Sequence, residues 1–142
     1  MAVVSGGTVA VLTPSGSPVP SVPASAVPPR AVALSRTHLA VQGPLTLDLY
    51  DPATGAKTKS LPLGPVAAVE LTGINAKVAL FVGPHHVVLV RLSDGRLISL
   101  PLANVIDPKL TETGLFYAYN TPKATMKGHI VFEPTARLLA RF

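Results

Sequence analysis

Three short triplets recur at a fixed interval along the chain. They are Ser21-Val22-Pro23, Ser60-Leu61-Pro62 and Ser99-Leu100-Pro101, and the interval from the first to the second equals that from the second to the third. Self-similarity at a fixed period is typical of repeat architectures, in which each repeat is one supersecondary unit. The spacing therefore predicts an array of like units, which limits the folds that the chain can adopt.

A second set of segments shares this interval: Leu39-Ala40-Val41, Val78-Ala79-Leu80 and Tyr117-Ala118-Tyr119. Each segment alternates large with small residues, and neither side of the alternation is polar. A strand of this kind is buried on both faces, so its sheet lies between two others. We expect Ala40, Ala79 and Ala118 to occupy equivalent places in stacked sheets, each packed tightly against its neighbours.

The composition favours many short strands separated by turns, with 48% hydrophobic residues, fifteen Pro and eleven Gly in 142 residues. The absence of Cys excludes disulfides and thiol catalysis. The net charge of +5 is scattered and Trp is absent, so we expect no nucleic-acid interface. No apolar run reaches the ~18 residues of a membrane span. The opening "MAVVSGGTVAVL" lacks a signal-peptide pattern, and the compartment is left open.

Each repeat is predicted to contain four strands. In the best-defined repeat they lie near Val32–Ser35, Leu39–Gln42, Leu45–Asp51 and Lys57–Leu63. The third of these, "LTLDLYDPATG", has copies at "HVVLVRLSDG" and "GHIVFEP", with Glu133-Pro134 standing where Asp51-Pro52 stand. The last repeat is expected to end in a fourth strand, Arg137–Phe142, paired near Ile130–Phe132.

The opening residues align without a gap under Leu39 to Gly55, so the chain is expected to begin inside a repeat, at its second strand. This register makes the Pro-rich segment Thr13–Pro29 a turn, an edge strand and a loop, because Pro is tolerated at a sheet edge. A polyproline linker is the alternative interpretation of the same segment.

Four-stranded units of this length, buried on both faces, are typical of a β-propeller. We therefore expect an all-β fold of four-stranded antiparallel blades, a partial propeller of about 3.75 blades. Residues 1–27 would form a partial blade lacking its first strand, and residues 28–64, 65–103 and 104–142 three blades. Such an array could be a fragment of a larger propeller, could associate with another copy, or could close as a four-bladed ring. A β-trefoil is the alternative fold, although its strands should carry more polar residues.

The turn motif "LYDPATG" resembles the corner between the third and fourth strands of bacterial YVTN-type and TolB-like propeller blades. The pair "GLFYAYN" and "GHIVFEP" is similar to the last blade of extracytoplasmic bacterial propellers. The resemblance covers most of the chain and implies a periplasmic or extracellular parent protein. The Gly-His and Trp-Asp dipeptides of the WD-repeat class are absent, and the turn motif carries no chemistry of its own.

Two loops supply the binding candidates. The longest loop, Asn120 to Gly128, contains Asn120, Lys123 and Lys127, and long loops on rigid scaffolds often carry binding function. A solvated loop without a specific site is the alternative. His85 and His86 are adjacent, so on a strand they point to opposite faces and do not readily chelate one ion. We therefore predict no metal site and no cofactor.

Only two acids, Glu70 and Glu112, fall near the first strands, which line the channel of a propeller. Two converging carboxylates could perform acid–base chemistry, although nothing in their spacing requires convergence. We predict a non-catalytic scaffold that binds a protein or cell-envelope ligand through its blade loops and that self-associates. The alternative is part of a propeller hydrolase or lyase whose site residues lie mostly on missing blades.

Overall fold

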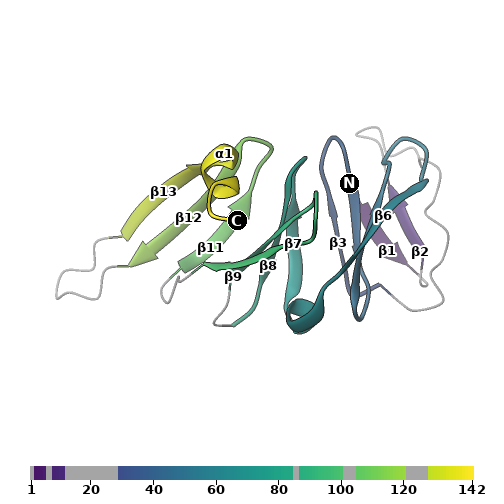
Figure 1. Cartoon of the computed structure of the whole chain (residues 1–142), viewed down its shortest axis with the longest axis horizontal. Helices are drawn as coiled ribbons and strands as arrows, with labels where there is room; N and C mark the ends of the chain where they lie inside the picture. Colours follow the sequence, from purple (N-terminus) through teal and green to yellow (C-terminus); the bar gives the residue numbers. More distant parts are fainter. Residues whose placement is uncertain (1, 6–7, 12–28, 85–86, 101–104, 121–127) are drawn as a thin grey trace.

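The chain folds into antiparallel β-sheets that follow one another in a row (Figure 1). The computed structural model describes residues 2–5, 8–11, 29–84, 87–100, 105–120 and 128–142. The first sheet pairs β1 (Ala2–Ser5) with β2 (Thr8–Val11). The second sheet has the order β3 (Ala31–Leu34), β4 (Leu39–Gln42), β5 (Thr46–Tyr50) and β6 (Lys57–Pro62).

A 3₁₀-helix, η1 (Gly64–Ala68), leads into the third sheet. This sheet has the order β7 (Glu70–Ile74), β8 (Val78–Val82), β9 (Val87–Arg91) and β10 (Leu97–Leu100). The fourth sheet contains β11 (Val105–Leu110), β12 (Gly114–Asn120) and β13 (Gly128–Pro134). A short helix, α1 (Thr135–Leu139), follows.

The strands of the second sheet lie within one residue of the predicted boundaries at every end. The sequence predicts Val32–Ser35, Leu39–Gln42, Leu45–Asp51 and Lys57–Leu63, and the structure shows residues 31–34, 39–42, 46–50 and 57–62. The all-β prediction is therefore confirmed, with three sheets of three or four strands each. Among the described strands no sheet closes on itself.

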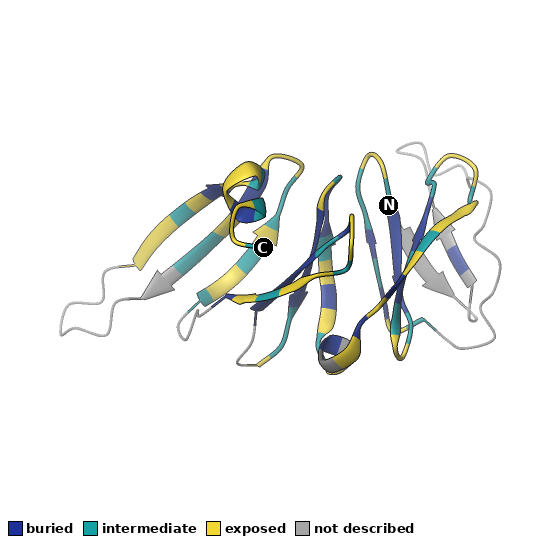
Figure 2. Cartoon of the chain, viewed as in Figure 1, coloured by how far each residue is buried: buried dark blue, intermediate teal, exposed yellow. Residues whose placement is uncertain are grey.

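Buried apolar residues lie between neighbouring sheets and form three clusters within the described part of the chain. Figure 2 shows the buried strands of the inner sheets in dark blue. We call the side of a sheet that meets the next sheet along the chain its forward face, and the other side its backward face. Leu39 and Val41 pack backward toward the first sheet, while Ala40 packs forward against the third. Strand β4 is thus buried on both faces, and β8 likewise, as the large-small alternation predicts.

The register of the repeat differs from the one predicted by the Ala positions. The turns at Ser35 and Asn75 close with the same backbone hydrogen bond, to the carbonyl three positions on, at 2.9 and 3.0 Å. Ala40 is the fifth residue after Ser35, and Leu80 is the fifth after Asn75, so these two correspond and the predicted equivalence of Ala40 with Ala79 is wrong. A one-residue slip reverses the face of every side chain in a strand. Ala40 and Ala79 consequently point into the same interface, between the second and third sheets.

The fourth sheet departs further from the predicted spacing. Thr111 closes its first turn with the same bond, at 2.8 Å, after a shorter interval than the one from Ser35 to Asn75. Ala118 is the seventh residue after Thr111 and therefore corresponds to Val82, the seventh after Asn75, rather than to Ala79. The forward face of the fourth sheet, onto which Ala118 projects, is covered by no described sheet.

The repeat is one residue longer between the first turns of the second and third sheets than between the Ser-Leu-Pro triplets, and a β-bulge in β6 accounts for this difference. Two adjacent residues of β5 lie opposite Lys57 and Lys59, so Thr58 is an extra residue in β6. Beyond it, Leu61 and Leu100 hold the same place in β6 and β10. The Ser-Leu-Pro repeats therefore mark equivalent strands, although the Ala repeats do not.

Replacing Ala79 by Leu should lower the stability of the chain by about 1–3 kcal/mol, because the interface between the second and third sheets has no room for the added carbons. Ala79 is fully buried in that interface. Ala118→Leu is the matched control, since its less enclosed position should accept the larger side chain at little cost. Denaturant unfolding measures both changes, and equal stability of Ala79→Leu and the wild type would contradict the described packing.

The C-terminal residues form a helix where the sequence predicts a fourth strand, Arg137–Phe142. The segment "TARLLARF" is rich in Ala, Leu and Arg, which are strong helix formers, and local propensity prevails here over the repeat register. Helix α1 buries Leu138 completely between the third and fourth sheets. The fourth sheet has three described strands, and the predicted pairing of a strand near Ile130–Phe132 is wrong.

Glu133 anchors this helix and does not cap a turn. Its buried carboxylate accepts a hydrogen bond from Arg141 Nη2 at 3.0 Å, and Arg141 Nε lies 2.7 Å from the other oxygen without hydrogen-bond alignment. Arg137 Nε is 4.0 Å away. Pro134, and not Glu133, holds the place of Asp51, so the predicted match is one residue out.

The first sheet agrees with the gap-free alignment of the opening residues. That alignment sets Ser5 on Gly43 and Thr8 on Thr46. In the structure Ser5 lies opposite Thr8 in the first hairpin, and the β4–β5 hairpin closes between Gly43 and Thr46. Strands β1 and β2 therefore match the second and third strands of a repeat. Residues 12–28, which contain most of the Pro-rich segment, lie outside the described residues.

Candidate functional site

The first turns of the second, third and fourth sheets converge at one end of the stack. Each turn is capped by a polar side chain, from Ser35, Asn75 and Thr111 respectively, which accepts backbone N–H bonds from its own turn. Asn75 also reaches the fourth sheet, because its Nδ2 donates to Thr111 O at 3.0 Å and to Thr135 Oγ1 at 3.1 Å. Side-chain hydrogen bonds thus hold the turn of one sheet against the next.

Glu112, in the first turn of the fourth sheet, accepts a hydrogen bond from the first turn of the second sheet. Its Oε1 accepts a hydrogen bond from Arg36 N at 2.8 Å, which joins the turn of the fourth sheet to that of the second. Glu70 begins β7 at the opposite end of the third sheet, where it lines a hollow of about 230 Å³ with Arg30. The two candidate acids therefore do not converge, and the structure offers no carboxylate pair at these positions.

A larger cleft lies between the second and third sheets at the turn end, with a volume of about 570 Å³. Lys59 reaches it from the second sheet, and Lys77 and Arg91 reach it from the third. Leu49 and Leu139 contribute apolar walls, the latter from α1. No acidic residue is among the described residues that line this cleft, so Lys59 and Lys77 give it a positive charge.

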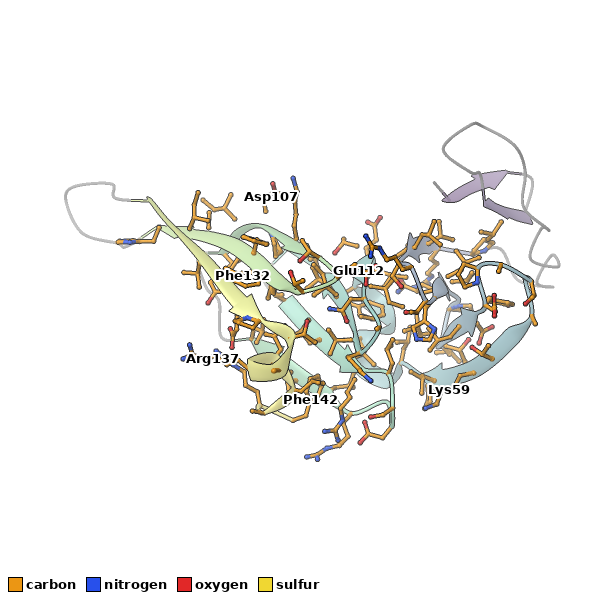
Figure 3. All side chains as sticks on the ribbon, turned by 90° about the horizontal axis from the view of Figure 1, so that it is seen from above. Lys59, Asp107, Glu112, Phe132, Arg137 and Phe142 are labelled. Carbon is orange, nitrogen blue, oxygen red and sulfur yellow. The ribbon has the colours of Figure 1, made fainter. Side chains whose placement is uncertain are left out.

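The bulge at Thr58 explains why a lysine faces this cleft. Lys57 and Lys59 would share one face of a regular strand, but the extra residue sends them to opposite faces. Lys57 turns backward and pairs with Asp48 at 2.8 Å, and this hydrogen bond raises the pKa of Lys57. Lys59 turns forward, away from that carboxylate. Figure 3 shows Lys59 on the second sheet, away from Asp107 and Phe132 of the fourth.

Lys59 is held in place by neutral oxygens. Its Nζ donates to Leu92 O at 2.8 Å and to Ser93 O at 2.5 Å. An ammonium group has three donors, so one remains available to a ligand. His38, at the turn of the second sheet, also lines the cleft, and its buried Nδ1 has no hydrogen-bond partner among the described residues. The site therefore combines a fixed cation with an unsatisfied polar atom.

Arg91 borders the cleft as half of an ion pair. Its Nε donates to Asp94 Oδ1 at 2.9 Å, and its Nη2 donates to Oδ2. The guanidinium also lies 5.2 Å from the ring centre of Phe142, within cation–π distance. The hydrogen bond from Arg91 is the main cause that lowers the pKa of Asp94 to about 2. Asp94 thus keeps Arg91 oriented across the neutral pH range.

Asp94 should remain ionised to unusually low pH. Because its folded pKa is lowered, the pair contributes stability above the pKa of an unfolded Asp, near 3.9, and that contribution is lost as the pH falls through about 2. An NMR titration of the Asp94 carboxyl carbon should give a midpoint near 2, and Arg91→Gln should move this midpoint upward. A wild-type midpoint near 4 would contradict the ion pair.

The candidate binding residues from the sequence fall largely outside the described residues. This holds for His85, His86, Lys123 and Lys127, while Asn120 is described only as the last residue of β12. The cleft was missed because Lys59, Lys77 and Arg91 are far apart in sequence and match no motif. The bulge at Thr58, which turns Lys59 toward the cleft, is visible in the sequence only as a one-residue change in the repeat interval.

Among the described residues, no group of three or more His, Cys, Asp or Glu side chains is arranged to hold a metal ion. Within the same residues, no helix has the length and apolar character needed to cross a membrane. No protein-family model and no curated protein matches the chain.

Proposed function

We propose that the chain is a non-catalytic binding module built from propeller-type blades, and that it binds a carboxylate-bearing protein segment in the cleft between the second and third sheets. The observation that carries this proposal is the lining of the cleft. Lys59 and Lys77 lie there beside Arg91, whose guanidinium is paired with Asp94, and no acid is among the described residues that line the cleft. A site that concentrates positive charge in a hollow attracts anionic groups.

The propeller part of the proposal is supported by the way the first strands of the sheets assemble. Strands β3 and β7 pack against each other, β11 packs against β7, and the turns that follow them share hydrogen bonds. In a propeller the first strands of the blades lie innermost around the axis. The cleft lies at the same end of the stack, because His38, Ala76 and Lys77 of these turns line it.

The chemistry of the cleft suits a short acidic segment with apolar side chains. A hydrogen bond from an ammonium to a carboxylate contributes about 1.5–3 kcal/mol, and the immobilised Lys59 loses little further freedom on binding. Leu49, Leu92 and Leu139 offer apolar contact beside the cations. A volume of about 570 Å³ lies within the usual range for small binding sites. Several residues of a peptide could therefore enter.

No observation favours the enzymatic alternative. Glu112 is occupied as an acceptor for Arg36 N, and Glu70 lies at the other end of its sheet. General acid–base catalysis needs groups within hydrogen-bond reach of the same substrate atoms. These two acids do not meet that condition.

A fluorescein-labelled peptide of alternating Glu and Leu tests this proposal by fluorescence anisotropy. We expect saturable binding that weakens about tenfold or more in Lys77→Ala, because one charge-assisted hydrogen bond is lost. Lys109→Ala is the matched control, since it removes the same charge from an exposed lysine of the fourth sheet and should bind normally. Equal weakening in both variants, or no binding by the wild type, would overturn the assignment of the cleft.

A further inference from the structure

The forward face of the fourth sheet carries large apolar side chains that no described element covers. Their exposed fractions are 50% for Ile106, 41% for Phe116, 83% for Ile130 and 43% for Phe132. We call these four residues, with Ala118 between them, the terminal face. Figure 2 shows much of β13 as exposed, in contrast with the buried strands of the inner sheets.

Residues at equivalent places in the inner sheets are buried by the next sheet. Phe116 lies opposite Phe132 in the fourth sheet, as Leu80 lies opposite Leu89 in the third. Both Leu80 and Leu89 are fully buried in the interface with the fourth sheet. The second sheet repeats the pattern, since Ala40 lies opposite Leu49 and both pack in the interface with the third sheet. The terminal face is thus built like a stacking surface and lacks its partner.

The terminal face is also close to electrically neutral. Lys109 and Asp107, both on β11, pair with each other at 3.1 Å and are mostly exposed. The two aromatic rings pack together with their centres 4.5 Å apart. The described residues of this face therefore offer no net charge to an acidic or basic partner. An apolar sheet face of similar size would find a matching surface.

We propose that a second copy of this chain covers the terminal face, and that the two copies pack their terminal faces together. The described part of the first sheet pairs two strands over four residues each, whereas the terminal face spans three strands. The terminal face of a second copy has three strands and matches in width. Two sheets stacked in this way form an isologous contact, in which each copy supplies the same residues.

The expected association is weak. With roughly 200 Å² for a large apolar side chain, the exposed parts of the four residues amount to about 400 Å² in each copy. A standard interface buries about 800 Å² per partner, so this contact belongs to the small, reversible class. The dimer should therefore dissociate on dilution.

Sedimentation velocity over a range of concentrations tests the proposal. The wild type should shift from monomer to dimer as its concentration rises, and Ile130→Lys should remain monomeric. Leu45→Lys is the matched control, because Leu45 is 67% exposed in the turn between β4 and β5. This variant should dimerise as the wild type does. Circular dichroism checks that each variant is folded. Ile106→Lys is a second variant of the same face and should also remain monomeric. A wild type that stays monomeric, or equal loss of dimer in Leu45→Lys, would refute the interface.

A cross-link separates this dimer from a head-to-tail stack of copies. The chain has no Cys, so Ala118→Cys introduces a single thiol at the middle of the terminal face. Mild oxidation should yield a disulfide-linked dimer, because both copies bring residue 118 to the interface. A head-to-tail contact contains only one such residue and would yield none. Absence of the linked species, or equal linkage through Leu45→Cys, would exclude the proposed packing.

Discussion

Replacing Gln42 by Leu should lower the free energy of unfolding by about 2–4 kcal/mol, although the two side chains are similar in size. Gln42 is 1% exposed and bridges the second sheet to the start of the third. Its Nε2 donates to Val69 O at 2.6 Å, and its Oε1 accepts from Leu71 N at 2.8 Å. Leu would leave this carbonyl and this N–H without their side-chain partner, and an unsatisfied buried group costs about 1–3 kcal/mol.

Urea unfolding of Gln42→Leu beside Ser60→Ala would measure this effect. Ser60 also loses a side-chain hydrogen bond, to Asp48, but it lies on the exposed edge strand β6, so its change should stay within about 0.5 kcal/mol. If Gln42→Leu were as stable as the wild type, the polar bridge would contribute nothing and apolar packing alone would hold the two sheets together.

Asn75→Ala should be at least as destabilising, with an expected loss of about 3 kcal/mol. The side chain is fully buried and makes four hydrogen bonds. Two of them cap its own turn, at Lys77 N and Val78 N, and two hold the fourth sheet at Thr111 and Thr135. Alanine would leave several of these buried groups unpaired at once, and a satisfied network contributes more than its bonds taken singly.

Ser35→Ala provides the comparison, because Ser35 caps the equivalent turn of the second sheet. It makes the two turn hydrogen bonds, at Thr37 N and His38 N, but it does not reach another sheet in the described structure. Its loss should cost about 0.5–1.5 kcal/mol. The difference between the two variants then measures the contact between the third and fourth sheets, and equal losses would show that this contact adds no stability.

The all-β class and the strands of the second sheet could be predicted from the sequence, because the alternation of large and small residues follows directly from burial on both faces. The detailed register could not. The spacing of the Ala residues matches the spacing of the Ser-Leu-Pro triplets, yet only the triplets occupy equivalent places. The bulge at Thr58 shifts the repeat interval by one position, and no single residue type predicts a bulge.

The C-terminal segment and the cleft show two other limits of prediction from sequence. Residues 135–139 follow their own helix propensity, and the ion pairs of Glu133 with Arg137 and Arg141 become visible only once the helix exists. The cleft depends on three cations from separate strands and turns. Their proximity follows from the stacking of two sheets, which the spacing of charges along the chain does not encode.

The hydrogen bond between Arg36 N and Glu112 has a consequence for the way the chain unfolds. In a linear repeat array each unit contacts only its neighbours, so the ends can unfold while the middle persists. Here the second and fourth sheets are joined directly across the third. Loss of the fourth sheet therefore also removes a contact of the second, which favours a single cooperative transition over stepwise fraying. Hydrogen exchange should show β4 and β8 opening with the same free energy.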